Sequence, residues 1–104
     1  MTISREVKEG KLIQGADEKI AYQLTTTPWG STPTSIVVKA YDITDGGRTD
    51  VTGTVLSGTA SVTGDVITCP VLQLLTAGNW YRLEIQFVAG GDTWEAYAII
   101  QAEY

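Results

Sequence analysis

Apolar and polar residues alternate with a period of two along much of this chain, most clearly between Trp80 and Val88. The apolar set there is Tyr81, Leu83, Ile85 and Phe87, and the polar set between them is Arg82, Glu84 and Gln86. Because successive side chains of a strand point to opposite faces, this pattern predicts a half-buried strand. Its apolar face should lie in the core and its polar face in water.

The same alternation predicts further strands, and turns rich in Gly, Pro and Asp separate them. The expected strands cover residues 20–24, 35–43, 51–56, 62–67, 66–72 (bent or ended at Pro70), 80–88 and 93–102. No window has sustained helical periodicity, and we expect at most one helical turn, from Leu72 to Ala77. Residues 1–16 are interpreted as a flexible arm or an edge strand, and residues 17–104 as one sandwich domain.

A corner precedes the strongest strand. Gly78 suits a left-handed turn, and Tyr81 follows just inside the strand, with apolar residues at every second position after it. This is the tyrosine-corner pattern of immunoglobulin-like domains, so we predict an all-β, immunoglobulin-like antiparallel β-sandwich of about seven strands. Leu83 stands where an antibody domain has its second cysteine, which excludes the antibody subtype.

Composition narrows the classes of partner. The chain of 104 residues fits one domain, and its formal net charge of −5 disfavours binding to nucleic acid or to anionic membranes. The first residues lack the basic-then-apolar order of a signal peptide, so we expect synthesis without export. A single cysteine permits no internal disulfide.

The residues offer little catalytic chemistry. There is no histidine, and we expect no catalytic, cofactor-binding or metal-binding residue. Cys69 is either a reactive thiol or a small buried hydrophobe, and the second interpretation is favoured. Asp42, Asp45 and Asp50 either bind calcium or hydrogen-bond their own turn, and the hydrogen-bonded turn is favoured. Glu84 and Glu95 are either paired catalytic carboxylates or part of a solvated face, and the solvated face is favoured.

Aromatic residues are the candidates for binding. Trp29, in the turn Pro28-Trp29-Gly30, is either a lid over the open end of the core or an exposed anchor, and the lid is favoured. Trp80 and Trp94 are expected to pack near each other or over the rims of the sheets. The candidate interaction residues are Trp29, Pro33 and Trp94.

Three stretches carry a family resemblance: 17–22, 29–42, and the corner from Leu75 to Leu83. In this order they resemble small immunoglobulin-like proteins encoded among the structural genes of tailed bacteriophages and prophages, and the corner also resembles fibronectin type III domains. The resemblance implies a non-enzymatic structural or accessory role through protein–protein association, in the virion or the bacterial cytoplasm. The implied partners are other phage structural proteins or the chain itself.

Two other functions remain open: a cell-surface adhesion or carbohydrate-binding module with Trp29 and Trp94 as stacking platforms, and a small hydrolase that uses Asp or Glu. For the structural or accessory function, we expect the isolated protein to be a monomer. The arm of this module, from Thr2 to Leu12, either adds a strand to the exposed sheet edge of a neighbour in an assembly or is a frayed terminus, and the second alternative is slightly favoured for the isolated protein.

Overall fold

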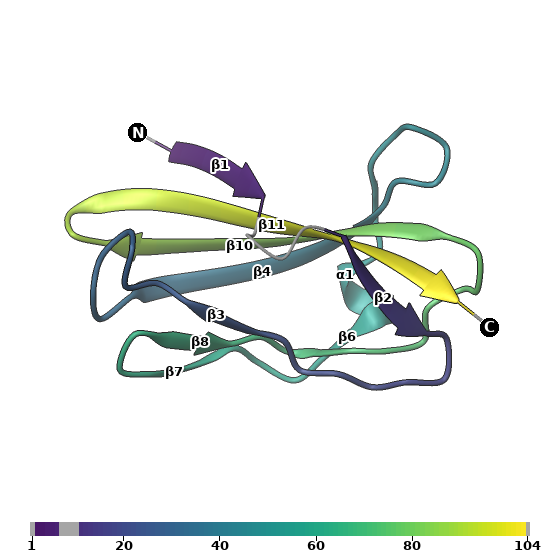
Figure 1. The fold of residues 1–104 in the computed structure, drawn as a ribbon, viewed down its shortest axis with the longest axis horizontal. Helices are drawn as coiled ribbons and strands as arrows, with labels where there is room; N and C mark the ends of the chain where they lie inside the picture. The colour runs from purple at the N-terminus through teal and green to yellow at the C-terminus, as the bar shows by residue number, and fades with distance from the viewer. Residues whose placement is uncertain (1, 7–10, 104) are drawn as a thin grey trace.

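Two long antiparallel strands, β10 (Trp80–Ala89) and β11 (Asp92–Glu103), form the centre of the larger sheet (Figure 1). Ala89 pairs with Asp92, so the connection is a two-residue turn formed by Gly90 and Gly91. Both glycines have positive φ, 61° and 85°, as the tight hairpin turn that matches strand twist requires. β4 (Thr34–Asp42) pairs antiparallel with β10, and the short β5 (Thr49–Asp50) follows at the edge.

Two N-terminal strands complete this sheet, in the computed structural model that describes residues 2–6 and 11–103. β1 (Thr2–Glu6) runs parallel to the first half of β11, and β2 (Leu12–Gly15) runs parallel to its last residues. The sheet is therefore mixed rather than antiparallel throughout. In this structure β1 lies on the edge of the chain's own sheet. The hypothesis that the arm from Thr2 to Leu12 adds a strand to a neighbour places the same segment on another molecule.

Short strands form the second layer, below the larger sheet in Figure 1. β3 (Gln23–Thr25), β8 (Val66–Thr68) and β7 (Ser61–Thr63) make one antiparallel sheet. β6 (Leu56–Ser57) and β9 (Val71–Leu72) make a two-stranded ladder beside it. The described residues thus contain eleven strand segments, several only two or three residues long, instead of about seven longer strands.

The core lies between the layers. The apolar face predicted for the strongest strand is buried, with Tyr81, Leu83, Ile85 and Phe87 at most 3% exposed. Leu24, Ile67 and Leu72 close the core from the second layer, and Ala96, Ala98 and Ile100 contribute from β11. Burial of each large apolar side chain stabilises the fold by about 1.5–3 kcal/mol. The prediction of an all-β fold with this inward face is confirmed.

Two local predictions are wrong: the strand at residues 51–56 and the helical turn from Leu72 to Ala77. Residues 51–56, expected as a strand, contain the helical turn α1 (Thr52–Val55), which buries Val55. The Asp50 carboxylate accepts the Thr52 N–H at 2.9 Å just before this turn, so a local hydrogen bond outweighs the alternating pattern.

The helical turn expected from Leu72 to Ala77 is absent. Its amides bond elsewhere: the Gln73 N–H donates to the Val55 carbonyl at 2.8 Å, and the Thr76 N–H donates to the Tyr81 hydroxyl at 2.9 Å. Leu74 between them has a φ of +55° and is 62% exposed. No helix in the described part of the chain is long and apolar enough to span a membrane.

Candidate functional site

The outer face of the larger sheet carries four of the five basic side chains that the structure describes, together with three aromatic rings, Tyr41, Trp80 and Tyr97. Strand alternation directs Arg82, Glu84 and Gln86 of β10 away from the core, opposite Tyr41, Lys39 and Val37 of β4. On the other side, Glu84 pairs with Tyr97 of β11 and Gln86 with Glu95. The sequence predicts this polar face, but it gives no indication that Glu84 is only 8% exposed.

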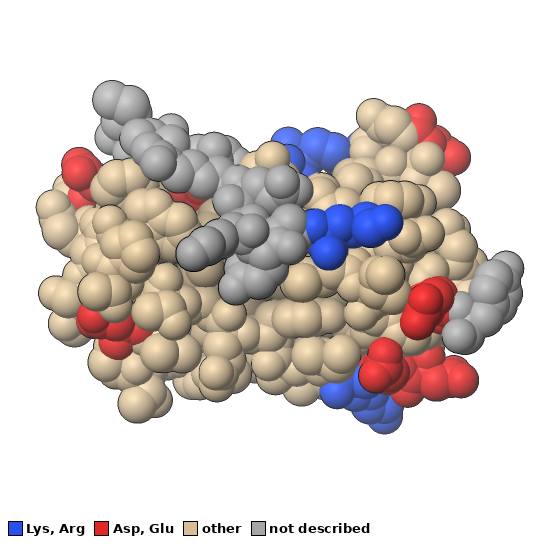
Figure 2. Space-filling view, in the orientation of Figure 1, with Lys and Arg blue, Asp and Glu red and all other residues tan. Residues whose placement is uncertain are grey.

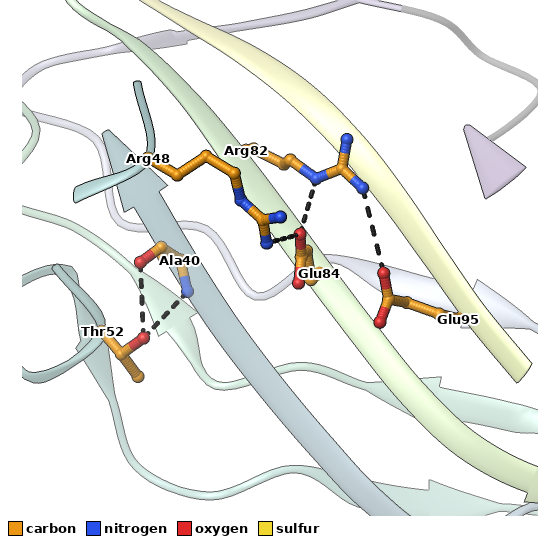
Figure 3. A network of polar contacts seen from close by, with 6 residues as sticks. All are labelled: Ala40, Arg48, Thr52, Arg82, Glu84 and Glu95. Atoms are coloured by element: carbon orange, nitrogen blue, oxygen red, sulfur yellow. Dashed lines mark hydrogen bonds and ion pairs between the residues drawn. The ribbon is translucent and has the colours of Figure 1, made fainter. Parts of the chain in front are cut away.

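Two arginines bury Glu84 (Figure 3). The Nε of Arg82 donates to Glu84 Oε2 at 2.7 Å, and an Nη of Arg48 donates to the same oxygen. Arg82 also lies 3.9 Å from Glu95 Oε1. The carboxylate therefore exchanges water for two charge-assisted hydrogen bonds, which are stronger than neutral ones. Arg48 comes from the loop between β4 and β5, where the sequence gives no signal that it would reach β10.

Three cations of this face lie over aromatic rings. The Arg82 guanidinium lies 3.7 Å from the centroid of Tyr97, and the Arg48 guanidinium lies 4.5 Å from that of Tyr41. Near the other end, the Lys11 ammonium lies 5.0 Å from the Trp80 ring and donates to Gln101 at 3.1 Å. Such pairs hold the long side chains in place while their outer surfaces stay available, as the 54% exposure of the Arg48 side chain illustrates.

A shallow depression of about 210 Å³ lies on this face. Its lining residues come from β4, β10 and β11: Val37, Lys39, Tyr41, Glu84, Gln86 and Glu95. Lys39 is exposed, and Val37 is 45% exposed beside it. The depression is open and lined by charged, amide and aromatic groups, so it suits contact with a polar surface better than enclosure of an apolar ligand.

The structure places Glu84 and Glu95 on this face, with Arg82 between them. A glycosidase pair needs two carboxyl groups that face a substrate across a cleft. Here both carboxylates contact one guanidinium, and the depression between the strands is shallow. The arrangement is that of an ion-pair network on a sheet surface.

The predicted interaction residues lie elsewhere, at the end of the sandwich near the β10–β11 turn. The Trp29 ring packs on Phe87 with centroids 5.7 Å apart, and the half-buried Trp94 donates from Nε1 to the Ala89 carbonyl at 3.1 Å. Pro33 is buried and offers no surface to a partner. Trp29 thus covers the end of the core, in the position of the lid.

Trp80 and Trp94 do not pack near each other. Trp80 pairs with Gln101, and Trp94 pairs with Phe87, so the two indoles lie toward opposite ends of the β10–β11 hairpin. Lys11 lies over the Trp80 ring, and the Trp94 side chain donates to the Ala89 carbonyl beside the β10–β11 turn.

The corner residues adopt the geometry that a tyrosine corner requires. Gly78 has a φ of +89°, and its N–H donates to the Ala102 carbonyl at 2.9 Å. Tyr81 is 3% exposed, and its hydroxyl accepts the Thr76 N–H, five residues upstream. The corner therefore ties the start of β10 to the loop before it.

Two of the three aspartates near the β4–β5 loop, Asp42 and Asp50, bond to residues two positions further on, and Asp50 Oδ1 accepts the Thr52 N–H at 2.9 Å. Asp42 Oδ1 accepts the Thr44 N–H at 2.9 Å and the Thr44 hydroxyl at 2.6 Å, and Asp42 Oδ2 accepts the Asn79 amide at 3.0 Å. Burial raises the pKa of Asp42, but these hydrogen bonds outweigh burial, so its pKa is lowered from the ordinary value. Within residues 2–6 and 11–103, no group of three His, Cys, Asp or Glu side chains is placed to hold a metal ion.

Cys69 is 2% exposed between β8 and β9, and its N–H donates to the Tyr22 carbonyl at 2.8 Å. Burial raises the pKa of its thiol to about 12. The thiolate is the nucleophile in cysteine chemistry, so this thiol is in an unreactive environment near neutral pH.

Comparison with known proteins finds no relative: no family model matches the chain, and no curated protein or solved structure is detectably similar to it.

Proposed function

We propose that this chain is a non-enzymatic structural or accessory module of phage or prophage origin, which works through protein–protein association. The observation that carries the proposal is the outer face of the larger sheet. Three strands, β4, β10 and β11, together with Lys11 and the β4–β5 loop, present three cations stacked on aromatic rings there, and the same strands line a shallow depression. Tyr, Trp and Arg are the residues most enriched where proteins bind one another.

The strand order supports the finer part of the proposal, an immunoglobulin-like sandwich. β4, β10 and β11 are neighbours in one sheet, and β3, β8 and β7 are neighbours in the other. Immunoglobulin domains group their third, sixth and seventh strands in one sheet and their second, fifth and fourth in the other. The proposed phage origin rests on the family resemblance of the sequence, which includes the corner before Tyr81 and the strand that ends at Asp42.

Association with particles tests this function. The chain, expressed with an epitope tag from its own genomic locus, should co-sediment with phage particles after prophage induction, together with head or tail proteins. A control variant with a disrupted core, Leu83→Asp, should be lost from the particles. Recovery of the wild-type chain only in the particle-free fraction would refute the proposal.

The carbohydrate-binding alternative differs in the site it would use. It needs Trp29 and Trp94 as open platforms, whereas Trp29 packs on Phe87 and Trp94 bonds to the β10–β11 turn. A glycan array distinguishes the two functions: glycan binding that is lost in Trp94→Ala would favour the alternative.

A further inference from the structure

The loop between β4 and β5 projects from the larger sheet (Figure 1), and it contains Asp45 and Gly46. Asp45 is exposed, and within the described part of the chain no hydrogen bond or ion pair holds its carboxylate. In the same orientation, Figure 2 shows acidic side chains at the surface where this loop projects. The Asp45 side chain is therefore free to turn toward the main chain of the next residue.

The other aspartates of the chain differ from Asp45 in one of two ways. Three of them accept hydrogen bonds that hold the carboxylate: Asp42, Asp50 and Asp65. Asp17 and Asp92 are exposed like Asp45, but a glutamate and a threonine follow them, and those side chains crowd the next main-chain nitrogen. Asp45 alone is followed by glycine.

We propose that Asp45 is a modification site, at which the aspartate converts spontaneously to isoaspartate. The main-chain nitrogen of Gly46 attacks Cγ of Asp45. An N–Cγ bond forms, and the proton of the nitrogen and the hydroxyl of the carboxyl group leave together as water. Water then adds to either carbonyl of the succinimide ring. Opening at Cγ restores aspartate, whereas opening at the main-chain carbonyl leaves Gly46 attached through the side chain, so atoms are conserved overall and water is the co-reactant.

The surroundings of Gly46 permit this attack. Gly46 has no side chain, and a Cβ built on it would meet nothing within 4 Å, so the approach of the Asp45 carboxyl group is unobstructed. The Gly46 N–H donates to the Ile43 carbonyl at 3.0 Å. This hydrogen bond must open before the nitrogen can react, and exposed hydrogen bonds in loops open at little cost in free energy.

Isoaspartate changes the outer face of the larger sheet, because Arg48 lies at the end of the same loop. The main chain gains one carbon atom at residue 45, so the turn from Ile43 to Gly46 cannot close as before. Arg48 donates to Glu84 and lies 4.5 Å from the centroid of the Tyr41 ring. We expect these two contacts to loosen as the loop rearranges. The reaction needs no partner, so it does not depend on the proposed function.

Peptide mapping of the full chain tests the inference. The folded protein is kept in mildly acidic, heavy-oxygen water at physiological temperature, and is then digested and analysed by mass spectrometry. The peptide that contains residue 45 should divide into two species that separate by chromatography and carry oxygen from the solvent. A methyltransferase specific for isoaspartate should label the second species. Peptides that contain Asp17 and Asp92 should stay single and unlabelled.

Two variants and a matched control separate this reaction from other changes in the loop. Asp45→Glu should abolish the second species, because the longer side chain has to close a larger ring. Gly46→Ala should lose most of it, because a Cβ crowds the attacking nitrogen. Gly47→Ala should react like the wild type, since a Cβ there also meets nothing within 4 Å and the sequence Asp45-Gly46 is kept. Circular dichroism establishes that every variant is folded.

The inference is overturned if the folded chain forms no isoaspartate at residue 45, whether or not the urea-unfolded chain does. Equal conversion at Asp17 or Asp92 would overturn it as well, as would an unchanged rate in Gly46→Ala. In the separated isoaspartate form, the NMR signals of the Arg48 guanidinium should shift and those of the Lys19 ammonium should not. An unshifted Arg48 signal would refute the effect on the outer face. Absence of the chain from phage particles bears on the proposed function alone.

Discussion

The Tyr81 hydroxyl is a polar group on a ring buried in the core, and it accepts the Thr76 N–H at 2.9 Å. Tyr81→Phe should lower the free energy of unfolding by about 0.5–1.5 kcal/mol, since the ring stays and one hydrogen bond is lost. Leu83→Ala should cost more, about 2–5 kcal/mol, because it opens a cavity. Urea unfolding measures both. Equal midpoints for the wild type and Leu83→Ala would contradict the buried position of Leu83.

Gln14 is a second polar core residue, which the sequence analysis did not find. It is fully buried; its Nε2 donates to the Leu72 carbonyl at 2.8 Å, and its Oε1 accepts the Tyr22 hydroxyl at 2.9 Å. Gln14→Met should destabilise the protein by about 1–3 kcal/mol, because both partners lose a bond. Tyr22→Phe in the same background should add little further cost. Full additivity of the two substitutions in urea unfolding would show that the residues do not interact.

Cys69 makes stability depend on pH in the alkaline range. Its pKa is raised by burial from 9.0 to about 12, so the folded state disfavours the thiolate. This contribution is fully present below pH 9.0 and is lost as pH rises toward 12. Between about pH 9 and pH 11, the wild type should lose more free energy of unfolding than Cys69→Ala, which keeps every other titrating group. Parallel pH profiles for the two proteins would contradict this.

At the scale of elements, the long strands were predictable and the short ones were not. β10 and β11 bury one face each, so the alternation of Tyr81 to Phe87 predicts both the strand and its inward side. α1 depends on the local Asp50–Thr52 hydrogen bond and also on a contact that no local pattern contains, because the Thr52 hydroxyl accepts the Ala40 N–H at 3.0 Å. The alternation of β10 places Arg82 and Glu84 on the outer face from the sequence alone. Arg48 lies in a loop, so no alternation predicts that it reaches this face.

The close approach of the β3–β4 loop to the β10–β11 turn depends on Gly30. Its φ is +154°, and a Cβ built there would lie 2.9 Å from Ala89 Cβ. Gly30→Ala should therefore destabilise the protein by about 1–3 kcal/mol and loosen Trp29 from Phe87. Gly47→Ala is the control, because a Cβ there meets nothing within 4 Å. Trp fluorescence during thermal unfolding reports both effects, and equal melting temperatures for the two variants would refute the first.

Over the whole molecule, the question is whether charge acts through its total or through particular pairs. A chain with a formal net charge of −5 gains from the loss of any carboxylate if only the total matters. Glu84→Gln and Glu95→Gln change that total equally. They differ in surroundings: the Glu84 side chain is 10% exposed and accepts from two arginines, whereas Glu95 is 21% exposed and 3.9 Å from one.

We therefore expect the two variants to move in different directions or by different amounts. Glu84→Gln leaves two guanidinium groups without their shared carboxylate and should cost about 1.5–3 kcal/mol, as charged hydrogen bonds do. Glu95→Gln should change the free energy of unfolding by no more than about 0.5 kcal/mol. Urea unfolding at low and high salt measures the contrast, and the Glu84→Gln cost should persist in salt, which screens buried pairs weakly. If both variants were equally stabilised, net charge alone would govern the molecule, and the arginine network would have no structural role.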